Sequence, residues 1–273
     1  SSGNITVWDV NSGKSVTANT TEILKKIVAN EVGGFTNAQL SVGDRRSLYQ
    51  AQAIAAHSWL IYQIRHGVST PSVGLAGSYS SEISTAVESV KDVLVKYNGD
   101  VANTAYGSGA AAKTNSAANM GWGSYAYLVS VESAFEQKFA PAQYYPKATT
   151  IKQETMRSNV IKMVGESVFK AYESKPESWI TEIHKDANGY VDYAVVCGQR
   201  ITGGKFYENC WGMYGANLVS WSYNSSAKSW VITTNGNGHG VGMSQYGAAG
   251  YIAQYGWNYT QVLQHYFPGT SVV

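Results

Sequence analysis

The stretch GNGHGVGMSQYGAAG, residues 236–250, places one histidine among six glycines near the end of the chain. The residues before it, KSWVITTN, alternate as a strand does, and MSQYGAAGYIAQYG is typical of a helix. Glycine adopts backbone conformations that other residues avoid, so we expect a tight crossover whose backbone can approach another group closely. His239 is then either a ligand for a bound molecule or a brace for the crossover.

Composition limits the class of protein. The chain has 273 residues, 44% of them hydrophobic and 14% charged, which predicts a globular protein with a large core. A net charge of +2 gives no reason to expect nucleic acid as a partner. No apolar run reaches the roughly 18 residues of a membrane span. Twenty tyrosines and eight tryptophans provide flat faces with polar edges, which suit sugar rings as well as ordinary packing.

Helical patterns dominate the first part of the chain and return at its end. They predict helices over 19–33, 44–66, 82–91 and 150–164, and two closing helices over 243–256 and 258–267. Asn19 with Glu22 forms a capping-box pattern, and Asp44 is expected to be the N-cap of the second helix. Gly33 and Gly34 are expected to end the first helix.

Strand patterns cluster in the middle of the chain. Asn98-Gly99 predicts a hairpin, and residues 178–211 are β-rich with expected turns at Asn188-Gly189 and Gly203-Gly204. We therefore predict an α+β fold in a single domain. Its helical-hairpin core covers about 19–134 and 226–271, and a β-rich subdomain is inserted at about 135–225. Cys197 and Cys210 flank a hairpin there, and a disulfide and two free thiols are equally open.

Three separated stretches resemble one known family. They are IVANEVGGF (27–35), QAQAIAAHSW (50–59) and GHGVGMSQYGA (238–248). They resemble the stage II sporulation protein D family (SpoIID/LytB) of bacterial peptidoglycan lytic transglycosylases and amidase enhancers, over about residues 20 to 271. The resemblance implies a fold with a long cleft that holds glycan strands freed of their stem peptides.

The resemblance assigns the family's catalytic glutamate to Glu31, although Val32-Gly33 replaces the Met-Pro that follows this glutamate in the family. The end of a helix and the apolar neighbours Val32 and Phe35 favour the protonated carboxyl that a general acid needs. From the residues alone, an exposed helix-end glutamate is the alternative. If the protein were instead a true muramidase, Asp44 would be its second carboxylate.

Several residues are candidate contacts for substrate. Gln52 lies in an apolar stripe and is either a cleft-facing ligand for an N-acetyl group or a buried polar residue satisfied by backbone. Ser108, in YGSGA, is either a turn residue or a hydroxyl that orients sugar or Glu31. Gly240 would let backbone lie against a sugar. The candidate substrate-binding set is Gln52, Ser108, His239, Gly240, Ser244 and Gln245.

No cofactor is expected. Some members of the family bind zinc through a histidine and a cysteine, and the matching positions here look like Ala105 and Ser108, so no metal is expected there. The expected activity is cleavage of MurNAc–GlcNAc bonds in peptide-free strands with 1,6-anhydro products. The alternative is a non-catalytic glycan-binding module that enhances an N-acetylmuramoyl-L-alanine amidase. Either function implies an extracytoplasmic protein. Because the sequence begins Ser-Ser-Gly, it is expected to be a fragment or mature form.

Overall fold

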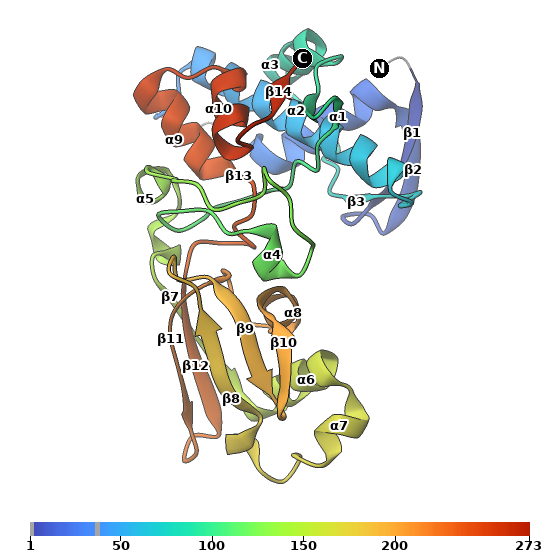
Figure 1. The fold of residues 1–273 in the computed structure, drawn as a ribbon. Helices are drawn as coiled ribbons and strands as arrows, with labels where there is room; N and C mark the ends of the chain where they lie inside the picture. The colour runs from blue at the N-terminus through green and yellow to red at the C-terminus, as the bar shows by residue number, and fades with distance from the viewer. Residues whose placement is uncertain (1–2, 36–38) are drawn as a thin grey trace. The chain divides into compact units, whose positions relative to one another are not determined.

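The fold was analysed in a computed structural model that describes residues 3–35 and 39–273. The chain divides into two compact units, one formed by Ser1–Tyr106 with Gly242–Val273 and the other by Gly107–Val241. Both units combine helices with small sheets (Figure 1), which confirms the α+β class. The subdomain expected at about 135–225 lies inside the second unit, which also contains residues 107–134 and 226–241.

Helices form the body of the first unit. They are α1 (Thr20–Val32), α2 (Val42–Arg65), α3 (Ser81–Val90), α9 (Gln245–Tyr255) and α10 (Tyr259–Tyr266). The long helix α2 contacts the other four. Its middle is therefore buried on all sides, and every residue from Ala51 to Ser58 is buried. The small alanines of QAQAIAAHSW allow this crowding, because they let neighbouring helices approach closely.

The first helix begins and ends close to where its sequence pattern predicts, but the predicted capping box is wrong, because the Glu22 carboxylate accepts from Lys25 Nζ at 2.9 Å and from the Tyr79 hydroxyl at 2.6 Å. The Asn19 side chain accepts a hydrogen bond from Thr21 N at 2.9 Å and so caps α1, and Gly33 is the C-cap. The predicted N-cap of α2 is wrong. Ser41 is the N-cap, and Asp44 occupies the third helical position of a reciprocal capping box in which its Oδ2 accepts from Ser41 N at 3.1 Å. Serine and aspartate three residues apart satisfy two amide groups at once, so the helix starts earlier than expected.

Short strands complete the first unit. One sheet has the order β2 (Lys14–Asn19), β1 (Asn4–Asp9), β3 (Ser72–Val73), and another has the order β14 (Ser271–Val272), β4 (Val95–Tyr97), β5 (Asp100–Val101). The turn between β4 and β5 places Asn98 at φ 49° and Gly99 at φ 83°. Two consecutive positive φ angles are what a tight hairpin requires, and the predicted Asn-Gly hairpin is confirmed.

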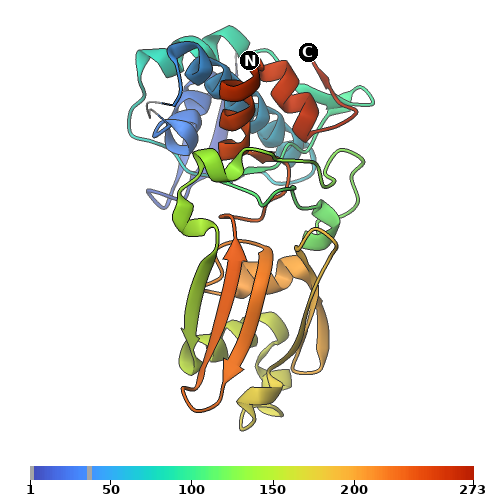
Figure 2. The same cartoon turned by 90° about the vertical axis from the view of Figure 1, so that its left-hand side faces the viewer.

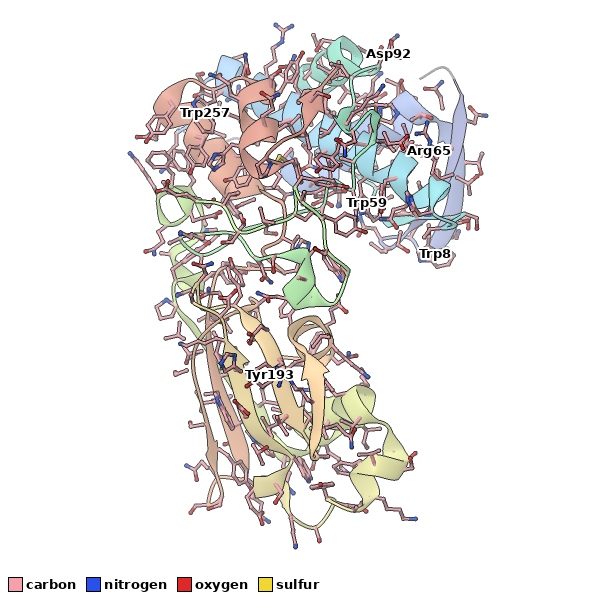
Figure 3. All side chains as sticks on the ribbon, viewed as in Figure 1. Trp8, Trp59, Arg65, Asp92, Tyr193 and Trp257 are labelled. Carbon is pink, nitrogen blue, oxygen red and sulfur yellow. The ribbon has the colours of Figure 1, made fainter. Side chains whose placement is uncertain are left out.

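Strand β6 (Tyr106–Gly107) pairs with β13 (Met243–Ser244). Gly242, just before β13, has φ +73°, and a Cβ there would overlap the carbonyl oxygen of Ala105. The amide of Met243 donates to that same oxygen at 3.0 Å. Glycine is thus required where the chain enters α9, because the backbone is both left-handed and in close contact. Trp257 follows α9, and its ring stacks on that of Tyr251 within the helix, with centroids 4.5 Å apart (Trp257 is labelled in Figure 3).

The second unit contains two three-stranded antiparallel sheets. One has the order β11 (Asn217–Asn224), β12 (Ser229–Asn235), β7 (Lys147–Lys152), and these strands lie side by side in Figure 2. The other has the order β10 (Gln199–Thr202), β9 (Val191–Val196), β8 (Ile180–Lys185). The helical segments are α4 (Ala117–Met120), α5 (Glu136–Phe139), η1 (Ala142–Tyr144), α6 (Gln153–Val164), α7 (Glu166–Lys170), η2 (Pro176–Ser178) and α8 (Gly203–Asn209).

The second unit has its own apolar core, centred on Trp179 and Trp230, whose rings stack at 5.5 Å. Cys197 and Cys210 are both buried free thiols in this core, and burial raises the pKa of Cys197 to about 11 and of Cys210 to about 12. The structure thus decides the open question of the disulfide in favour of free thiols. The turn expected at Gly203-Gly204 is wrong, because these glycines begin α8.

Gly203 and Gly204 are required because other parts of the backbone lie against them, and not because the chain turns there. The Thr202 hydroxyl caps α8 by accepting from Lys205 N at 3.0 Å. A Cβ at Gly203 would overlap the carbonyl oxygen of Val191, and a Cβ at Gly204 would overlap that of Met120. The helix can therefore pack against β9 and α4 only because its first two residues have no side chains.

Candidate functional site

Glu31 lies in the last turn of α1 and is half-buried. The stripe of apolar residues on α1 fixes the helix against the core, with Ile27, Val28 and Val32 all fully buried. Phe35 follows the helix and stacks on Tyr246, with ring centroids 4.5 Å apart and planes 19° apart. The Glu31 carboxylate is therefore held at the end of a rigid helix beside an aromatic pair, in a position that solvent still reaches.

Gln245 links Glu31 to a second helix. Its side-chain Nε2 donates to Glu31 Oε2 at 2.9 Å and to Gln52 Oε1 at 3.0 Å. Gln245 is 2% exposed, and it is the first residue of α9. Glu31, Gln52 and Gln245 come from α1, α2 and α9, so the fold gathers them into one hydrogen-bonded group that we call the Glu31 cluster.

Gln52 is completely buried on α2. Its carbonyl oxygen is bonded to Gln245, but its Nε2 is a buried donor without a hydrogen-bond partner among the described residues. A buried unpaired amide costs stability, typically about 1–3 kcal/mol, and is a place to look for function. Gln52 is therefore buried, but its carbonyl oxygen is bonded to the side chain of Gln245 and not to backbone, and its contact with substrate stays a prediction.

Tyr106 belongs to the surroundings of Glu31 although the sequence did not single it out. Burial, and secondarily the charge of the Glu31 carboxylate, raise the pKa of the Tyr106 phenol. The phenol therefore stays protonated and can donate a hydrogen bond at any physiological pH. The only sequence clue was its place in AYGSG, two residues before Ser108.

Ser244 acts on the helix that carries Gln245. Its side chain is the N-cap of α9 and accepts from Gly247 N at 3.1 Å. Ser244 is 4% exposed, so its hydroxyl is used within the protein and lies away from solvent. The cap fixes where α9 begins, and with it the position of the Gln245 side chain.

The remaining candidates belong to the second unit. His239 is half-buried, and its Nδ1 accepts a hydrogen bond from Val241 N at 2.9 Å. Its carbonyl oxygen accepts from Asn115 Nδ2 at 3.0 Å, and its ring meets Trp122 edge-on at 5.1 Å. These contacts brace the crossover, and they fix the tautomer with the proton on Nε2, which makes that nitrogen a donor.

Gly240 is buried and has φ +76°. A Cβ at this position would come within 2.8 Å of the Tyr190 ring. Tyr190 is itself fixed, because its hydroxyl donates to Lys113 O at 2.7 Å and accepts from Ala111 N at 3.0 Å. The close approach that Gly240 permits is thus to a tyrosine of the same unit.

Ser108 is half-buried and directly follows β6. The next residue, Gly109, donates from its amide to Asn237 O at 3.0 Å, which ties this segment to the loop that leads to His239. Ser108, His239 and Gly240 all lie in the second unit, whereas Glu31, Gln52, Ser244 and Gln245 lie in the first. Contact of any of them with substrate stays a prediction.

Metal and membrane features can be stated for the described residues. In residues 3–35 and 39–273, no group of three or more His, Cys, Asp or Glu side chains could hold a metal ion. Ala105, at one of the positions expected to lack zinc, is buried. No helix in the part of the chain that the structure describes is long and apolar enough to cross a bilayer.

Comparison with known proteins finds distant bacterial relatives. No family model matches the chain. It is 26% identical over 192 residues to stage II sporulation protein D of Bacillus subtilis, which covers 70% of the chain and 51% of that protein. It is 25% identical over 191 residues to the protein of the same name from Bacillus amyloliquefaciens, with the same coverage.

A third relative widens the comparison. The chain is 23% identical over 270 residues to the amidase enhancer of Bacillus subtilis, covering 82% of the chain and 37% of that protein. The chain thus spans about half the length of the first relatives and about a third of the other. These matches define a class of bacterial proteins named for sporulation and amidase enhancement. These similarities support assigning the chain to the stage II sporulation protein D (SpoIID/LytB) family.

Proposed function

We propose that this protein is a peptidoglycan lytic transglycosylase that cleaves MurNAc–GlcNAc bonds in peptide-free glycan strands, with Glu31 as its acid and base. The observation that carries the proposal is the hydrogen bond from Gln245 Nε2 to Glu31 Oε2 at 2.9 Å. It holds a partly exposed carboxyl group in one orientation, as proton transfer to a substrate requires. The family relationship supplies the substrate class.

The reaction needs a single carboxyl group. Protonated Glu31 donates its proton to the glycosidic oxygen, the bond from the MurNAc anomeric carbon to that oxygen breaks, and the GlcNAc end leaves with a new hydroxyl. The Glu31 carboxylate then takes the proton from the MurNAc 6-hydroxyl, whose oxygen bonds to the anomeric carbon. Water does not enter, and the product is a 1,6-anhydro ring. Attack within one sugar benefits from a high effective molarity.

Gln245 decides which carboxyl oxygen carries the proton. Its amide occupies Oε2 as a donor, and an oxygen that accepts a hydrogen bond in this geometry is not the one that bears the proton. Oε1 is therefore the oxygen that exchanges the proton with substrate.

Because the proposed substrate is peptidoglycan, the protein would act outside the cytoplasmic membrane, in wall remodelling or sporulation.

The test uses two substrates. Purified protein is incubated with intact and with peptide-free peptidoglycan, and the soluble products are weighed by mass spectrometry. We expect anhydro products, 18 mass units lighter than those of hydrolysis because one water is not added, from peptide-free strands alone. Glu31→Gln should abolish them, whereas Glu154→Gln, on the exposed side of α6, should not. Reducing-end products, or full activity of Glu31→Gln, would contradict the proposal.

A second function is favoured by one observation. The similarity to the amidase enhancer extends over 82% of the chain, more than the similarity to the sporulation proteins. On this alternative the protein binds glycan and stimulates an N-acetylmuramoyl-L-alanine amidase without cutting strands itself. The two functions separate cleanly in one experiment. An enhancer would release nothing alone, would raise the rate of an added amidase, and would do so equally well as Glu31→Gln.

A further inference from the structure

Trp211 is the most exposed of the large hydrophobic side chains in the described residues, at 79% exposure. It follows α8 in the sequence NCWGMYG, and it is far in sequence from every residue of the Glu31 cluster. Leaving an indole in water forgoes the burial free energy that a protein gains by placing such a residue inside. An isolated exposed side chain needs no explanation, so the loop that carries Trp211 and the surface beside it decide its meaning.

The loop that carries Trp211 is fixed at several points. The Met213 amide donates to Cys210 O at 3.0 Å, and Asn159 Nδ2 donates to the carbonyl oxygen of Trp211 at 3.3 Å. Gly212 has φ +102° and packs so close to Ile151 that a Cβ would lie 3.0 Å from its side chain. The backbone beneath the indole is thus rigid, which lowers the entropy lost when a ligand binds there.

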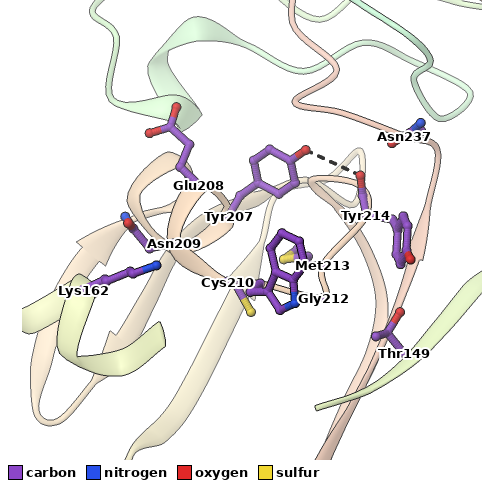
Figure 4. A pocket seen from close by; sticks show the side chains of 11 residues that line it. Thr149, Lys162, Tyr207, Glu208, Asn209, Cys210, Gly212, Met213, Tyr214 and Asn237 are labelled. Carbon is purple, nitrogen blue, oxygen red and sulfur yellow. Dashed lines mark hydrogen bonds between the residues drawn. The ribbon is translucent and has the colours of Figure 1, made fainter. Parts of the chain in front are cut away.

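Trp211 borders a hollow of about 570 Å³ (Figure 4). Two more aromatic residues line it, Tyr207 and Tyr214, and the Tyr207 hydroxyl donates to Tyr214 O at 3.5 Å. Tyr214 is 40% exposed, and the Lys147 ammonium group lies 5.3 Å from the centroid of its ring. Polar side chains complete the lining, among them Asn209, Asn237 and Lys162. All of these residues belong to the second unit.

We propose that this hollow, which we call the Trp211 pocket, binds an N-acetylated hexosamine unit of a glycan strand. A pyranose ring has an apolar face of C–H groups and a polar rim of hydroxyls, and it fits a surface that combines aromatic faces with amides. The acetamido group adds a carbonyl acceptor and an N–H donor, for which the Asn209 and Asn237 side chains offer both kinds of partner.

The lining argues against other ligands of similar size. Lys162 and Glu208 place opposite charges on it, so it is not a phosphate or nucleic-acid site, which would gather cations of one sign. An apolar peptide would leave the polar side chains unpaired. The inference rests on the proposed function for the identity of the glycan. It adds a binding site that belongs wholly to a different unit from Glu31.

The experiment measures binding and cleavage separately. Titration calorimetry with chitotetraose, a β-1,4-linked oligomer of N-acetylglucosamine, gives the Kd of the wild type and of Trp211→Ala. We expect Trp211→Ala to weaken binding by about tenfold or more, as loss of an aromatic anchor does. The matched control is Trp8→Ala, which removes an exposed tryptophan of β1 (Figure 3) at 40% exposure outside the pocket. Thermal unfolding of each variant checks that the fold survives.

The outcomes distinguish this site from the proposed function. Unchanged affinity of Trp211→Ala, or no binding by the wild type, would overturn the Trp211 pocket, even if Glu31-dependent cleavage of strands is observed. Loss of affinity in Trp211→Ala with no cleavage by any form of the protein would keep the pocket and reject the transglycosylase. Tyr214→Phe keeps the ring that borders the pocket, and it should bind like the wild type; Tyr214→Ala should bind more weakly.

Discussion

The Gln245 side chain donates one hydrogen bond to Glu31, 214 positions away in the chain, and another to Gln52, 193 positions away. A single buried amide thereby fixes the orientation of a carboxyl group on a different helix. The Ser244 cap sets the start of α9 and hence where that amide lies. The sequence analysis treated Gln52, Ser244 and Gln245 as separate candidate contacts for substrate. In the structure they position the Glu31 carboxyl group.

On the proposed function, Gln245→Leu should lower kcat about 10- to 100-fold with a smaller effect on KM, because the carboxyl group stays but loses its orientation. The variant should also lose about 1–3 kcal/mol of unfolding free energy, since Gln52 Oε1 becomes a buried acceptor without a donor. Initial rates on peptide-free strands and urea denaturation measure the two effects.

The control for that variant is Gln254→Leu, which changes an exposed glutamine on the same helix. It should leave rate and stability near those of the wild type. A Gln245→Leu variant with unaltered kcat and a raised KM would show that Gln245 binds substrate and does not position Glu31.

Gln52→Met tests the buried amide. Methionine has a similar size and no polar group, so the substitution removes a hydrogen bond to Gln245 and also removes the unpaired Nε2. The two effects oppose each other, and we expect the unfolding free energy to change by less than about 1 kcal/mol. Turnover should still fall, because Gln245 loses one of its two anchors. A large loss of stability with normal turnover would mean that Gln52 is only a structural residue.

The sequence could predict features that depend on near neighbours. Asn19 next to a helical stripe predicts the start of α1, and Asn98-Gly99 predicts a hairpin, because the groups that decide these features lie within a few residues. The resemblance assigned Glu31, and the residue patterns offered Gln52 and Gln245 as substrate contacts, but neither could show that these side chains bond to each other. That arrangement depends on how α1, α2 and α9 pack.

Other predictions were wrong for one of two reasons. Either two neighbouring residues suited the same role, or the residue contacted lies far away in the sequence. Asp44 and Ser41 both suit a helix start, and the capping box assigns them different roles. The glycines at 203–204 resemble a turn, yet their partners are the carbonyl oxygens of Val191 and Met120. The number of tryptophans in the sequence does not show which of them is exposed, so the sequence did not predict the Trp211 pocket.

His57 predicts a dependence of stability on pH. It is 3% exposed in α2, and desolvation lowers its pKa to about 4 from 6.5, while the weaker attraction of Asp92 acts the other way. In the unfolded chain His57 binds a proton near pH 6.5, whereas in the folded chain it does so only near pH 4. Stability is therefore unaffected by this group above pH 6.5 and falls as pH decreases toward 4, by on the order of 3 kcal/mol.

His57→Gln isolates this contribution, because glutamine does not titrate. Urea denaturation from pH 7 to pH 4 should show a smaller loss for the variant than for the wild type, with the difference developing between pH 6.5 and pH 4. Carboxyl groups contribute equally to both proteins and cancel in the difference. Parallel curves for the two proteins would mean that the folded state protonates His57 as readily as the unfolded state does.

Gly240 and Gly256 form a matched pair for testing why the crossover is rich in glycine. Both have positive φ, +76° and +67°, but a Cβ at Gly240 would lie 2.8 Å from the Tyr190 ring, whereas nothing lies within 4 Å of one at Gly256. Gly256→Ala should cost about 1–2 kcal/mol for the left-handed backbone alone. Gly240→Ala should cost that amount plus about 1–3 kcal/mol for overpacking against a tyrosine that two hydrogen bonds hold in place. If urea denaturation gives equal losses for the two variants, Tyr190 can move aside, and the glycine at 240 serves the backbone angle or an external ligand and not this internal contact.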